Sequence, residues 1–405
     1  MRVTKLVLRN WRNYQEATIS LGAGPQLFLG RNGQGKTNII EAIGYFNSLS
    51  SHRVASDGPL MRVGDTNTVV RMRVLSGTRE VSLELEFNQG RPKRAQINGN
   101  RVQPRELTRW FTSVLFAPED LAIVKGDPAT RRAFLDEAIV TRVPAFAATL
   151  RDYAQVVKQR SALLKNARAN SYGSLSGSNL AMLDVWDEQL TDFGTRIMAE
   201  RRRLISDLMP YLRDSYQNLV NNDHRPELML AETGSLLQPG FTPETFVAGE
   251  SDTNFDHLSN VSRETLMKDF TEALKQRRSE EFDRGMTLVG SHRDELFIGL
   301  NSLPVKGYAS HGESWSMALA LKLAFANLVR DESTTGDPVL ILDDVFAELD
   351  GERRSRLLAA VGDYEQIIVT AAVAADVPNN QHWNTTEISH GRVVSPENSG
   401  EEGEL

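Results

Sequence analysis

The sequence predicts an α/β fold that is built around a phosphate-binding loop and interrupted by a helical insertion. Three observations predict this fold. A short apolar run, Pro25–Leu29, leads into a glycine-rich loop and then a helical pattern. A second apolar run, Pro338–Leu342, ends in two aspartates much later in the chain. Between the two runs, alternating stretches typical of antiparallel strands give way to a long helical region.

The N-terminal part of the chain has the pattern of strands around one helix. Residues 3–11 alternate between apolar and polar side chains, which indicates an early strand. A helix is expected over residues 36–49. Alternating stretches within residues 69–97, followed by the turn pair Asn98-Gly99, predict an antiparallel sheet attached to the phosphate-binding core.

The middle of the chain changes to a helical pattern. Apolar residues recur at near-helical spacing over residues 131–219, with a Gly/Ser-rich break at residues 171–179. Two helices joined at such a break predict an antiparallel arm of about 40 Å at 1.5 Å per residue, too short for a long coiled coil. Residues 221–260 are polar with scattered Pro and Gly and are expected to form a loop.

The composition is that of a soluble globular protein and excludes several classes. Hydrophobic residues make up 40% of the chain and charged residues 24%. No apolar run approaches the roughly 18 residues of a membrane span, and the N-terminus lacks the cleavage site of a signal peptide. The chain has no cysteine, which excludes disulfides and thiolate zinc sites and favours a cytoplasmic location.

The charge is distributed unevenly along the chain. The formal net charge is −7, with about +10 on residues 1–210 and about −17 on residues 211–405. Such an asymmetry suggests one face that attracts an anion. The alternative is that the acidic segments are merely solvated, because charge counted along a sequence is not charge mapped on a surface.

Residues 30–37 match the P-loop pattern GxxxxGK[ST] at every defined position. Glycines let backbone N–H groups turn toward phosphate oxygens, and the following helix presents its positive N-terminus to the same anion. Lys36 is expected to reach the β- and γ-phosphates of ATP, and Thr37 to supply a hydroxyl ligand to Mg²⁺. The predicted ATP-binding residues are Gly30, Arg31, Asn32, Gly33, Gln34, Gly35, Lys36, Thr37 and Asn38.

Two adjacent carboxylates, Asp343 and Asp344, end the second apolar run. A buried parallel strand next to the P-loop strand would place Asp343 near the Mg²⁺. Asp344 would then face the attacking water as a general base, so that Asp344 and Lys36 are the predicted catalytic residues. The alternative is an ordinary core strand that ends in two surface aspartates.

A candidate for a second ATP contact lies shortly before that strand, at the start of a helical pattern. In ABC-type ATPases this slot holds the sequence LSGGQ, which binds the γ-phosphate held by the opposite subunit. Ser310 and Gly312 match it, whereas Ala309, His311 and Glu313 replace Leu, the first Gly and Gln. A Ser side chain and a Gly N–H at a helix N-terminus can bind an anion. The alternative is a plain helix N-cap. The predicted trans contacts are Ser310, Gly312 and Glu313.

Several segments together resemble the RecF family, and the resemblance spans nearly the whole chain. Roughly 270 residues separate Lys36 from Ser310, which is intermediate between ABC transporter subunits and SMC proteins. The segments that resemble the family are Leu8–Tyr14, Ser51–Arg53, Phe116–Leu121, Val124–Pro128, Arg131–Asp136, Gly290–Glu295 and Asp343–Asp350. His311 and Glu313 depart from it, since the family usually has glutamines there. The histidine of ABC transporters is absent after Thr370, as in RecF-like proteins, so slow hydrolysis is expected.

The resemblance implies a P-loop ATPase head of the ABC/SMC type with an antiparallel β subdomain and an inserted helical domain. Residues 1–130 and 285–394 would form the head, residues 131–284 the helical domain with its arm, and residues 395–405 an acidic disordered tail. It also implies ATP and Mg²⁺ as cofactors and an ATP-dependent homodimer. The implied partners are DNA, at duplex or gap junctions, and the mediator proteins RecO and RecR, in recombinational repair and replication.

Basic residues in the positive half of the chain could contact DNA phosphates without base readout. The predicted contacts are Arg53, Arg62, Arg71, Arg73, Arg131 and Arg132, with Lys93, Arg94 and Arg201–Arg203 as further basic residues. For each of them, the alternative is a solvated arginine or one that pairs with an acid.

Two other functional classes stay open at this point. One is another SMC-like ATPase head, of a defence or nuclease-coupled system, but the residues after Val394 are too few for a nuclease domain. The other is an ABC transporter subunit, which would need a transmembrane partner and the LSGGQ sequence and histidine that this chain lacks.

Overall fold

The computed structural model describes residues 1–170, 177–222, 224–236, 261–378 and 381–394. The tail predicted at residues 395–405 lies outside them. The chain forms two compact units. Unit 1 comprises Met1–Asp120, Asp214–Asn221 and Leu319–Leu405, and unit 2 comprises Leu121–Arg213 and Asn222–Ala318.

The first sheet of unit 1 is antiparallel, with strand order β2-β1-β4-β5-β6-β7. Its strands are β1 (Arg2–Trp11), β2 (Tyr14–Ser20), β4 (Asn67–Ser76), β5 (Arg79–Asn88), β6 (Arg91–Ile97) and β7 (Asn100–Val102). Asn98 and Gly99 turn the chain between β6 and β7 with φ of 50° and 80°, the left-handed values that a tight hairpin turn requires. The antiparallel sheet predicted from the alternating pattern is therefore present.

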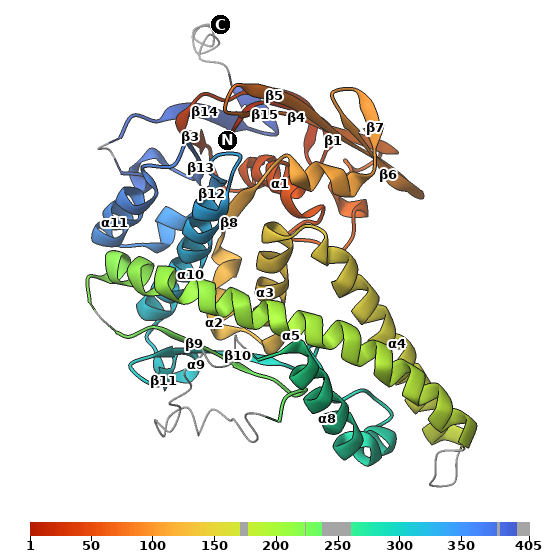
Figure 1. Ribbon diagram of the computed structural model, residues 1–405. Helices are drawn as coiled ribbons and strands as arrows, with labels where there is room; N and C mark the ends of the chain where they lie inside the picture. Colours follow the sequence, from red (N-terminus) through yellow and green to blue (C-terminus); the bar gives the residue numbers. More distant parts are fainter. Residues whose placement is uncertain (171–176, 223, 237–260, 379–380, 395–405) are drawn as a thin grey trace, which may run out of the picture. The chain divides into compact units, whose positions relative to one another are not determined.

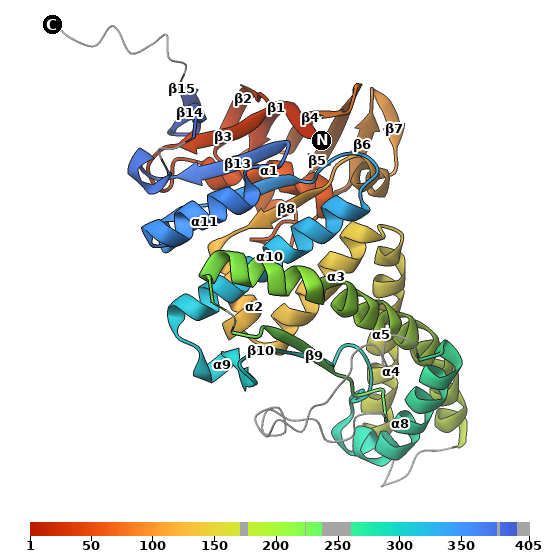
Figure 2. The ribbon, with the colours of Figure 1, turned by 60° about the vertical axis from the view of Figure 1, so that its left-hand side comes forward.

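The second sheet of unit 1 has strand order β15-β14-β3-β13-β12-β8 and is parallel from β14 to β8. Its strands are β3 (Gly24–Leu29), β8 (Ser113–Phe116), β12 (Val339–Asp343), β13 (Gln366–Ala371), β14 (Asn384–Ser389) and β15 (Arg392–Val394). Figure 2 shows β14, β3 and β13 side by side. The prediction that the aspartate strand lies next to the P-loop strand is wrong, because β13 lies between β3 and β12.

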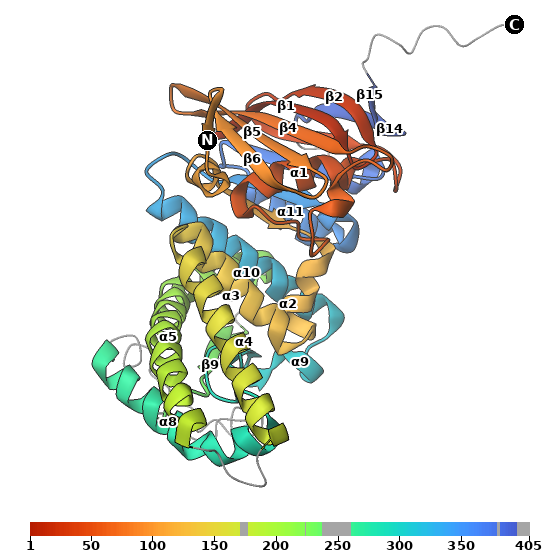
Figure 3. The same ribbon diagram turned by 90° about the vertical axis from the view of Figure 1, so that its right-hand side faces the viewer.

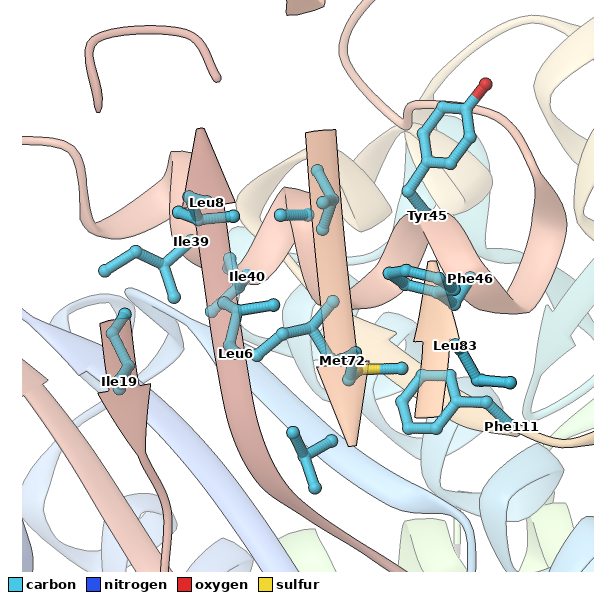
Figure 4. Packing of buried hydrophobic residues seen from close by; sticks show 14 of the residues in the cluster. Leu6, Leu8, Ile19, Ile39, Ile40, Tyr45, Phe46, Met72, Leu83 and Phe111 are labelled. Atoms are coloured by element: carbon cyan, nitrogen blue, oxygen red, sulfur yellow. The ribbon is translucent and has the colours of Figure 1, made fainter. Parts of the chain in front are cut away.

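Helix α1 (Lys36–Ser48) packs between the two sheets of unit 1. Its buried residues Ile39, Ile40 and Phe46 belong to one cluster with residues of both sheets, such as Leu6 and Ile341. Figure 4 shows these α1 side chains facing the strands of the antiparallel sheet. Because each such side chain contributes about 1.5–3 kcal/mol on burial, α1 is held firmly between the two sheets.

Helix α11 (Gly351–Val361) covers the other face of the parallel sheet. Figure 1 shows α1 and α11 on opposite sides of β12 and β13. This arrangement follows from right-handed crossovers that run in opposite directions along the sheet, because the chain passes from β3 through α1 toward β8, whereas it passes from β12 through α11 back to β13.

Unit 2 is built from helices and a small three-stranded sheet. The helices are α2 (Leu121–Lys125), α3 (Pro128–Arg142), α4 (Phe146–Asn170), α5 (Gly177–Val220), α8 (Arg263–Arg284), α9 (Val305–Tyr308) and α10 (His311–Glu332), of which α5 and α10 continue into unit 1. The sheet has order β11-β10-β9, with β9 (Glu227–Ala231), β10 (Glu295–Leu300) and β11 (Leu303–Pro304). The loop predicted over residues 221–260 is therefore wrong at β9, and residues 237–260 lie outside the described residues.

Helices α4 and α5 are the helical pair that the spacing predicts. Figure 3 shows them running alongside each other with α8 packed against them. Arg160 of α4 is fully buried and bonds Asp187 of α5 and Glu281 of α8, each at 2.6 Å. Removing either acid would leave a buried charge without its partner, so this network fixes the three helices relative to one another.

The two units divide the chain differently from the ranges expected from sequence. Residues 285–394 were expected to belong to the ATPase head, whereas β10, β11 and the first turns of α10 lie in unit 2. The reason is that residues 295–299 of β10 form a sheet with β9, which also belongs to unit 2. The ranges of the functional domains stay a prediction.

Candidate nucleotide site

The P-loop of unit 1 connects β3 to α1. Gly33 and Gly35 have φ of 80° and 116°, backbone conformations that non-glycine residues rarely adopt. The Lys36 ammonium lies within the loop and donates to the carbonyl oxygens of Gly30 at 2.5 Å and Arg31 at 3.2 Å. Burial lowers the pKa of Lys36, while the nearby carboxylates of unit 1 act against that shift. A lysine ammonium within a loop of backbone N–H groups forms a binding site for an anionic phosphate.

The turn between β1 and β2 supports the P-loop from one side. Tyr14 Oη donates to the Gly35 carbonyl at 3.1 Å, and Asn13 Nδ2 donates to the Gln34 carbonyl at 3.1 Å. Trp11 Nε1 donates to the Asn38 carbonyl at 2.8 Å. These bonds give a physical reason for the N-terminal segment that resembles the RecF family, a segment to which the sequence assigned no role.

Asp343 ends β12 and meets the start of α1. Its Oδ1 atom accepts hydrogen bonds from Thr37 Oγ1 at 3.3 Å and from Thr370 Oγ1 at 2.6 Å. Burial raises the pKa of Asp343, and these two hydroxyls act against that shift. Although β13 separates the two strands, the first turn of α1 therefore reaches the carboxylate.

Asp344 follows in a left-handed conformation with φ of 53°. Its N–H donates to Thr370 Oγ1 at 2.9 Å, and burial raises the pKa of its carboxyl group. The Oδ1 atom of Asp344 is buried without a hydrogen-bond partner among the described residues. A buried carboxylate oxygen of this kind indicates a polar ligand at the site.

One cavity of about 410 Å³ in unit 1 joins these groups. It is lined by Asn32, Gly33, Gly35, Lys36, Thr37, Asn38, Arg53, Pro118, Glu119, Asp343 and Asp344. Six of the nine predicted P-loop residues are among them, together with both predicted aspartates. Gly30, Arg31 and Gln34 do not line the cavity.

Three further residues of this cavity, Arg53, Pro118 and Glu119, had no nucleotide role assigned from sequence. Glu119 follows β8, and its charge contributes to the raised pKa of Asp343. Arg53, which was predicted to contact DNA, donates to Asn38 Oδ1 at 2.9 Å. The signal for Glu119 was its place in a segment that resembles the RecF family, but only the strand order brings that segment to the P-loop.

The residues present fit a magnesium ion. A threonine hydroxyl and carboxylate oxygens are the hard donors that Mg²⁺ prefers, and it binds typically through one or two carboxylates with phosphate oxygens. The Thr37 hydroxyl and the Asp343 carboxylate provide these donors, and the unpartnered Asp344 Oδ1 belongs to the same cavity.

Ser310 lies in unit 2 and caps α10. Its Oγ accepts from the Glu313 N–H at 3.2 Å, and the Glu313 carboxylate accepts from the Ser310 N–H at 2.8 Å. This reciprocal pair is a capping box. The N-cap alternative from the sequence is thus realised, and the contact with a partner's ATP stays a prediction for Ser310, Gly312 and Glu313.

The predicted DNA contacts of the antiparallel sheet are exposed arginines with acidic neighbours. Arg71 pairs with Glu84, and Arg73 lies 4.0 Å from Glu80. Their side chains are 53% and 52% exposed. Because exposed ion pairs contribute only about 0–1 kcal/mol, a phosphate could replace either acid. Arg62, which lies outside the strands, likewise forms an ion pair that is partly exposed, with Asp65 at 3.2 Å.

Two other predicted DNA contacts, Arg131 and Arg132, bond groups within unit 2. Arg131 is buried and forms a bidentate pair with Glu295 at 2.6 and 3.0 Å. Arg132 donates to the Asp294 carbonyl at 2.8 Å and is half-buried. We therefore remove Arg131 from the predicted contacts, because breaking a buried pair leaves a charge without compensation. Of the further basic residues, Arg201 and Arg202 are buried as well, whereas Arg203 is exposed.

Comparison with known proteins gives full-length matches. The RecF/RecN/SMC N-terminal domain family matches residues 2–390. The DNA replication and repair protein RecF of Leifsonia xyli subsp. xyli is 46% identical over 400 residues, which cover 98% of this chain and 100% of that protein. RecF of Streptomyces avermitilis is 44% identical over 395 residues, covering 97% and 99%.

Solved structures match the fold over the same length. The structure of the recombination mediator protein RecF-ATP in the RecFOR pathway has a TM-score of 0.81 at 25% identity, covering 97% of this chain and 96% of that one. A structure of an SMC head bound to the C-winged helix domain of ScpA has a TM-score of 0.52 at 14% identity, and the match covers 97% of each chain. The predicted fold class, an ABC/SMC-type head with an antiparallel sheet and a helical insertion, is confirmed. Within the described residues, no helix has the length and apolar character needed to cross a membrane.

Proposed function

The chain belongs to the RecF family of the RecF/RecN/SMC group, and on that premise we propose that it is an ATP-binding protein of DNA replication and repair that dimerises on DNA. The observation that carries this proposal is the single cavity that joins the P-loop, Lys36 and Thr37 with Asp343 and Asp344. We further propose that it acts in the cytoplasm with RecO and RecR, as the RecFOR pathway of a similar structure suggests.

The nucleotide would lie with its phosphates along the P-loop. Lys36 would leave its carbonyl partners and pair with the β- and γ-phosphates, because a charge-assisted bond to phosphate is stronger than one to a neutral carbonyl. Thr37 and Asp343 would hold Mg²⁺, which supplies charge neutralisation of the phosphates when bound. Asp344, whose pKa is raised by burial, would orient and deprotonate the attacking water.

Hydrolysis is proposed to be slow, so that ATP acts as a switch. Ala371 and Ala372 follow Thr370, where ABC transporters have their histidine, and neither alanine side chain can polarise a phosphate oxygen or a water. A slow ATPase keeps the ATP-bound state long enough to act on DNA.

Dimerisation would depend on ATP through Ser310. The residue is exposed at the N-terminus of α10, and its Oγ accepts one hydrogen bond there. The hydroxyl proton can therefore donate to a phosphate oxygen, while the helix N-terminus attracts the same negative charge. ADP has no γ-phosphate, so it should not support a dimer built on this contact.

DNA would be held by phosphate contacts rather than by base readout. Arg71 and Arg73 project from the same face of β4, since they alternate with the buried residues Met72 and Val74. A monomer of net charge −7 should bind DNA weakly, and a dimer would double the number of such contacts. ATP binding and DNA retention are then linked through dimerisation.

Sedimentation with ATP, with ADP and without nucleotide tests this function. The wild type should dimerise with ATP only. Ser310→Arg should bind ATP as a monomer, because the P-loop is unchanged, and should stay monomeric. Ser279→Arg places the same side chain on an exposed position of α8 and should dimerise like the wild type. A Ser310→Arg variant that dimerises with ATP, or a wild type that dimerises equally with ADP, would show that Ser310 is only a helix cap.

A further inference from the structure

Thr370 is the second-last residue of β13, the strand between the P-loop strand β3 and the aspartate strand β12. Thr370 pairs with Asp343 of β12 on one side and with Phe28 of β3 on the other. The residue is 1% exposed. Its hydroxyl donates to Asp343 Oδ1 at 2.6 Å and accepts from the Asp344 N–H at 2.9 Å.

A hydroxyl group is needed for this double contact. It carries one proton and two acceptor lone pairs, so it can donate to a carboxylate and accept from an N–H at once. Valine has nearly the same shape but can do neither, which makes it an informative replacement for threonine. Serine keeps both hydrogen-bonding functions.

The bond to Asp343 fixes the direction of that carboxylate. Oδ1 receives two hydroxyl donors, Thr370 Oγ1 and Thr37 Oγ1, and Oδ2 receives neither of these bonds. The carboxylate plane is therefore set by one residue of α1 and one of β13. Without the closer donor, at 2.6 Å, the carboxylate could rotate about its χ2 bond, a broad torsion with little intrinsic preference.

The bond to Asp344 holds an unfavourable turn. Asp344 has φ of 53° and ψ of 20°, a left-handed conformation that residues other than glycine, Asp among them, adopt only as single residues in turns. Its N–H has Thr370 Oγ1 as its acceptor, and the turn directs the Asp344 side chain into the cavity of about 410 Å³. One hydroxyl thus contacts the carboxylate of one aspartate and the backbone of the next.

We propose that Thr370 is a positioning residue of the nucleotide site, which sets the orientation of Asp343 toward the metal and of Asp344 toward the attacking water. The proposal rests on the proposed ATP function. It assigns a role to the end of β13, where the sequence showed only that a histidine is lacking. Thr370 itself touches neither nucleotide nor water in this role, and it acts through the two aspartates.

Nucleotide binding with and without Mg²⁺ tests the proposal independently of hydrolysis. The probe is a fluorescent ADP analogue, titrated in Mg²⁺ and in EDTA. In Thr370→Val, the affinity in EDTA should stay within about threefold of the wild type, because the P-loop is intact. The gain in affinity from Mg²⁺ should fall by about tenfold or more, as expected for the loss of a hydrogen bond to a charged group. The value of kcat should fall by a similar factor or more.

Thr68→Val is the matched control in the same unit. Thr68 is 0% exposed on β4 and donates to the Arg9 carbonyl at 2.8 Å, so this change also removes a buried hydroxyl bond. It should leave the Mg²⁺ effect unchanged. Thr370→Ser should behave like the wild type within about threefold, since serine keeps both bonds. If Thr370→Val does not fold, Thr370→Cys carries the test, because a weak thiol donor should give an intermediate Mg²⁺ effect.

The outcomes separate this proposal from the proposed function. A Thr370→Val or Thr370→Cys variant with the Mg²⁺ effect of the wild type would overturn the positioning role and leave the ATP function standing. A Thr370→Ser variant as impaired as Thr370→Val would also overturn it, since the methyl group would then be what matters. A wild type that binds nucleotide without any Mg²⁺ effect would overturn the ATP function and the Thr370 role together.

Discussion

Gly35→Ala should weaken nucleotide binding strongly, because the P-loop has no room for a Cβ at this position. Gly35 has φ of 116°, and a Cβ there would lie 2.6 Å from Asn13 Nδ2 and 2.8 Å from Tyr14 Oη. The backbone strain alone is about 1–3 kcal/mol. Tyr14 is fully buried and cannot move aside, so its bond to the Gly35 carbonyl would also be lost, at about 0.5–1.5 kcal/mol. The total is about 1.5–4.5 kcal/mol.

We expect the loop to relax under this strain rather than unit 1 to unfold, because α1 is anchored between two sheets. The amides of the loop then leave their phosphate-binding positions, and the Kd for ATP should rise by about tenfold or more, since about 1.4 kcal/mol corresponds to that factor. Calorimetric titration with ATP measures Kd, and denaturant unfolding of the same sample measures stability. Wild-type affinity together with wild-type stability in Gly35→Ala would refute this account of the loop.

Alanine variants of two other glycines, Gly33 and Gly64, distinguish the effect of the Cβ clash from that of the backbone strain. Gly33 has φ of 80° and none of the described residues within 4 Å of its Cβ position, so Gly33→Ala should carry the strain without the clash and weaken binding less. Gly64 has φ of 92° and is equally open, but it lies outside the loop. Gly64→Ala should reduce stability by about 1–3 kcal/mol and leave ATP binding unchanged.

Three further predictions concern the carboxylates, the exposed sheet and a buried histidine. Asp343→Asn should weaken Mg²⁺-dependent nucleotide binding. Asp344→Asn should bind nucleotide normally and hydrolyse ATP at least about 100-fold more slowly, as expected for the loss of a general base. An equal loss of nucleotide binding in both variants would contradict these separate roles. The double change of Arg71 and Arg73 to alanine should reduce the slope of log K for DNA against log salt by about 2, and an unchanged slope would exclude these contacts. Burial lowers the pKa of His292 from 6.5 to about 4. Between these two pH values the unfolded chain binds a proton at His292 and the folded protein does not, so the folded protein loses stability as the pH falls from 6.5 toward 4. The free energy of unfolding, measured with denaturant at a series of pH values, should therefore fall less steeply in His292→Gln than in the wild type, by up to about 1.4 kcal/mol per pH unit. The same pH dependence in variant and wild type would contradict this role of His292.

The sequence predicts the parts of the site better than their arrangement. The P-loop pattern and the two aspartates are local signals, because each depends on a strand end and a few neighbouring residues. The position of β13 between β3 and β12 depends on long-range pairing, and nothing in residues 366–371 indicates which strands they pair with. For the same reason no nucleotide role could be predicted for Thr370 or Glu119, although both interact with Asp343.

The charged residues show a second limit of sequence reasoning. Arg131 and Arg71 look alike in a basic half of the chain, but one is buried against Glu295 and the other is exposed on β4. Their partners are 164 and 13 residues away in the chain. Only the tertiary fold decides which arginine is available to a phosphate, so a count of charges identifies a region and not its contacts.

The central claim is that ATP bound at the P-loop controls binding to DNA. The most direct test is a DNA titration of the wild type and Lys36→Met on duplex, single-stranded and gapped DNA, with ATP, with ADP and without nucleotide. We predict that ATP raises the affinity of the wild type for duplex or gapped DNA by about tenfold or more, through the added contacts of a dimer. ADP should have no such effect, and Lys36→Met should bind DNA equally under all three conditions. Equal affinity of the wild type in ATP and ADP, or a gain with ATP in Lys36→Met, would contradict the claim.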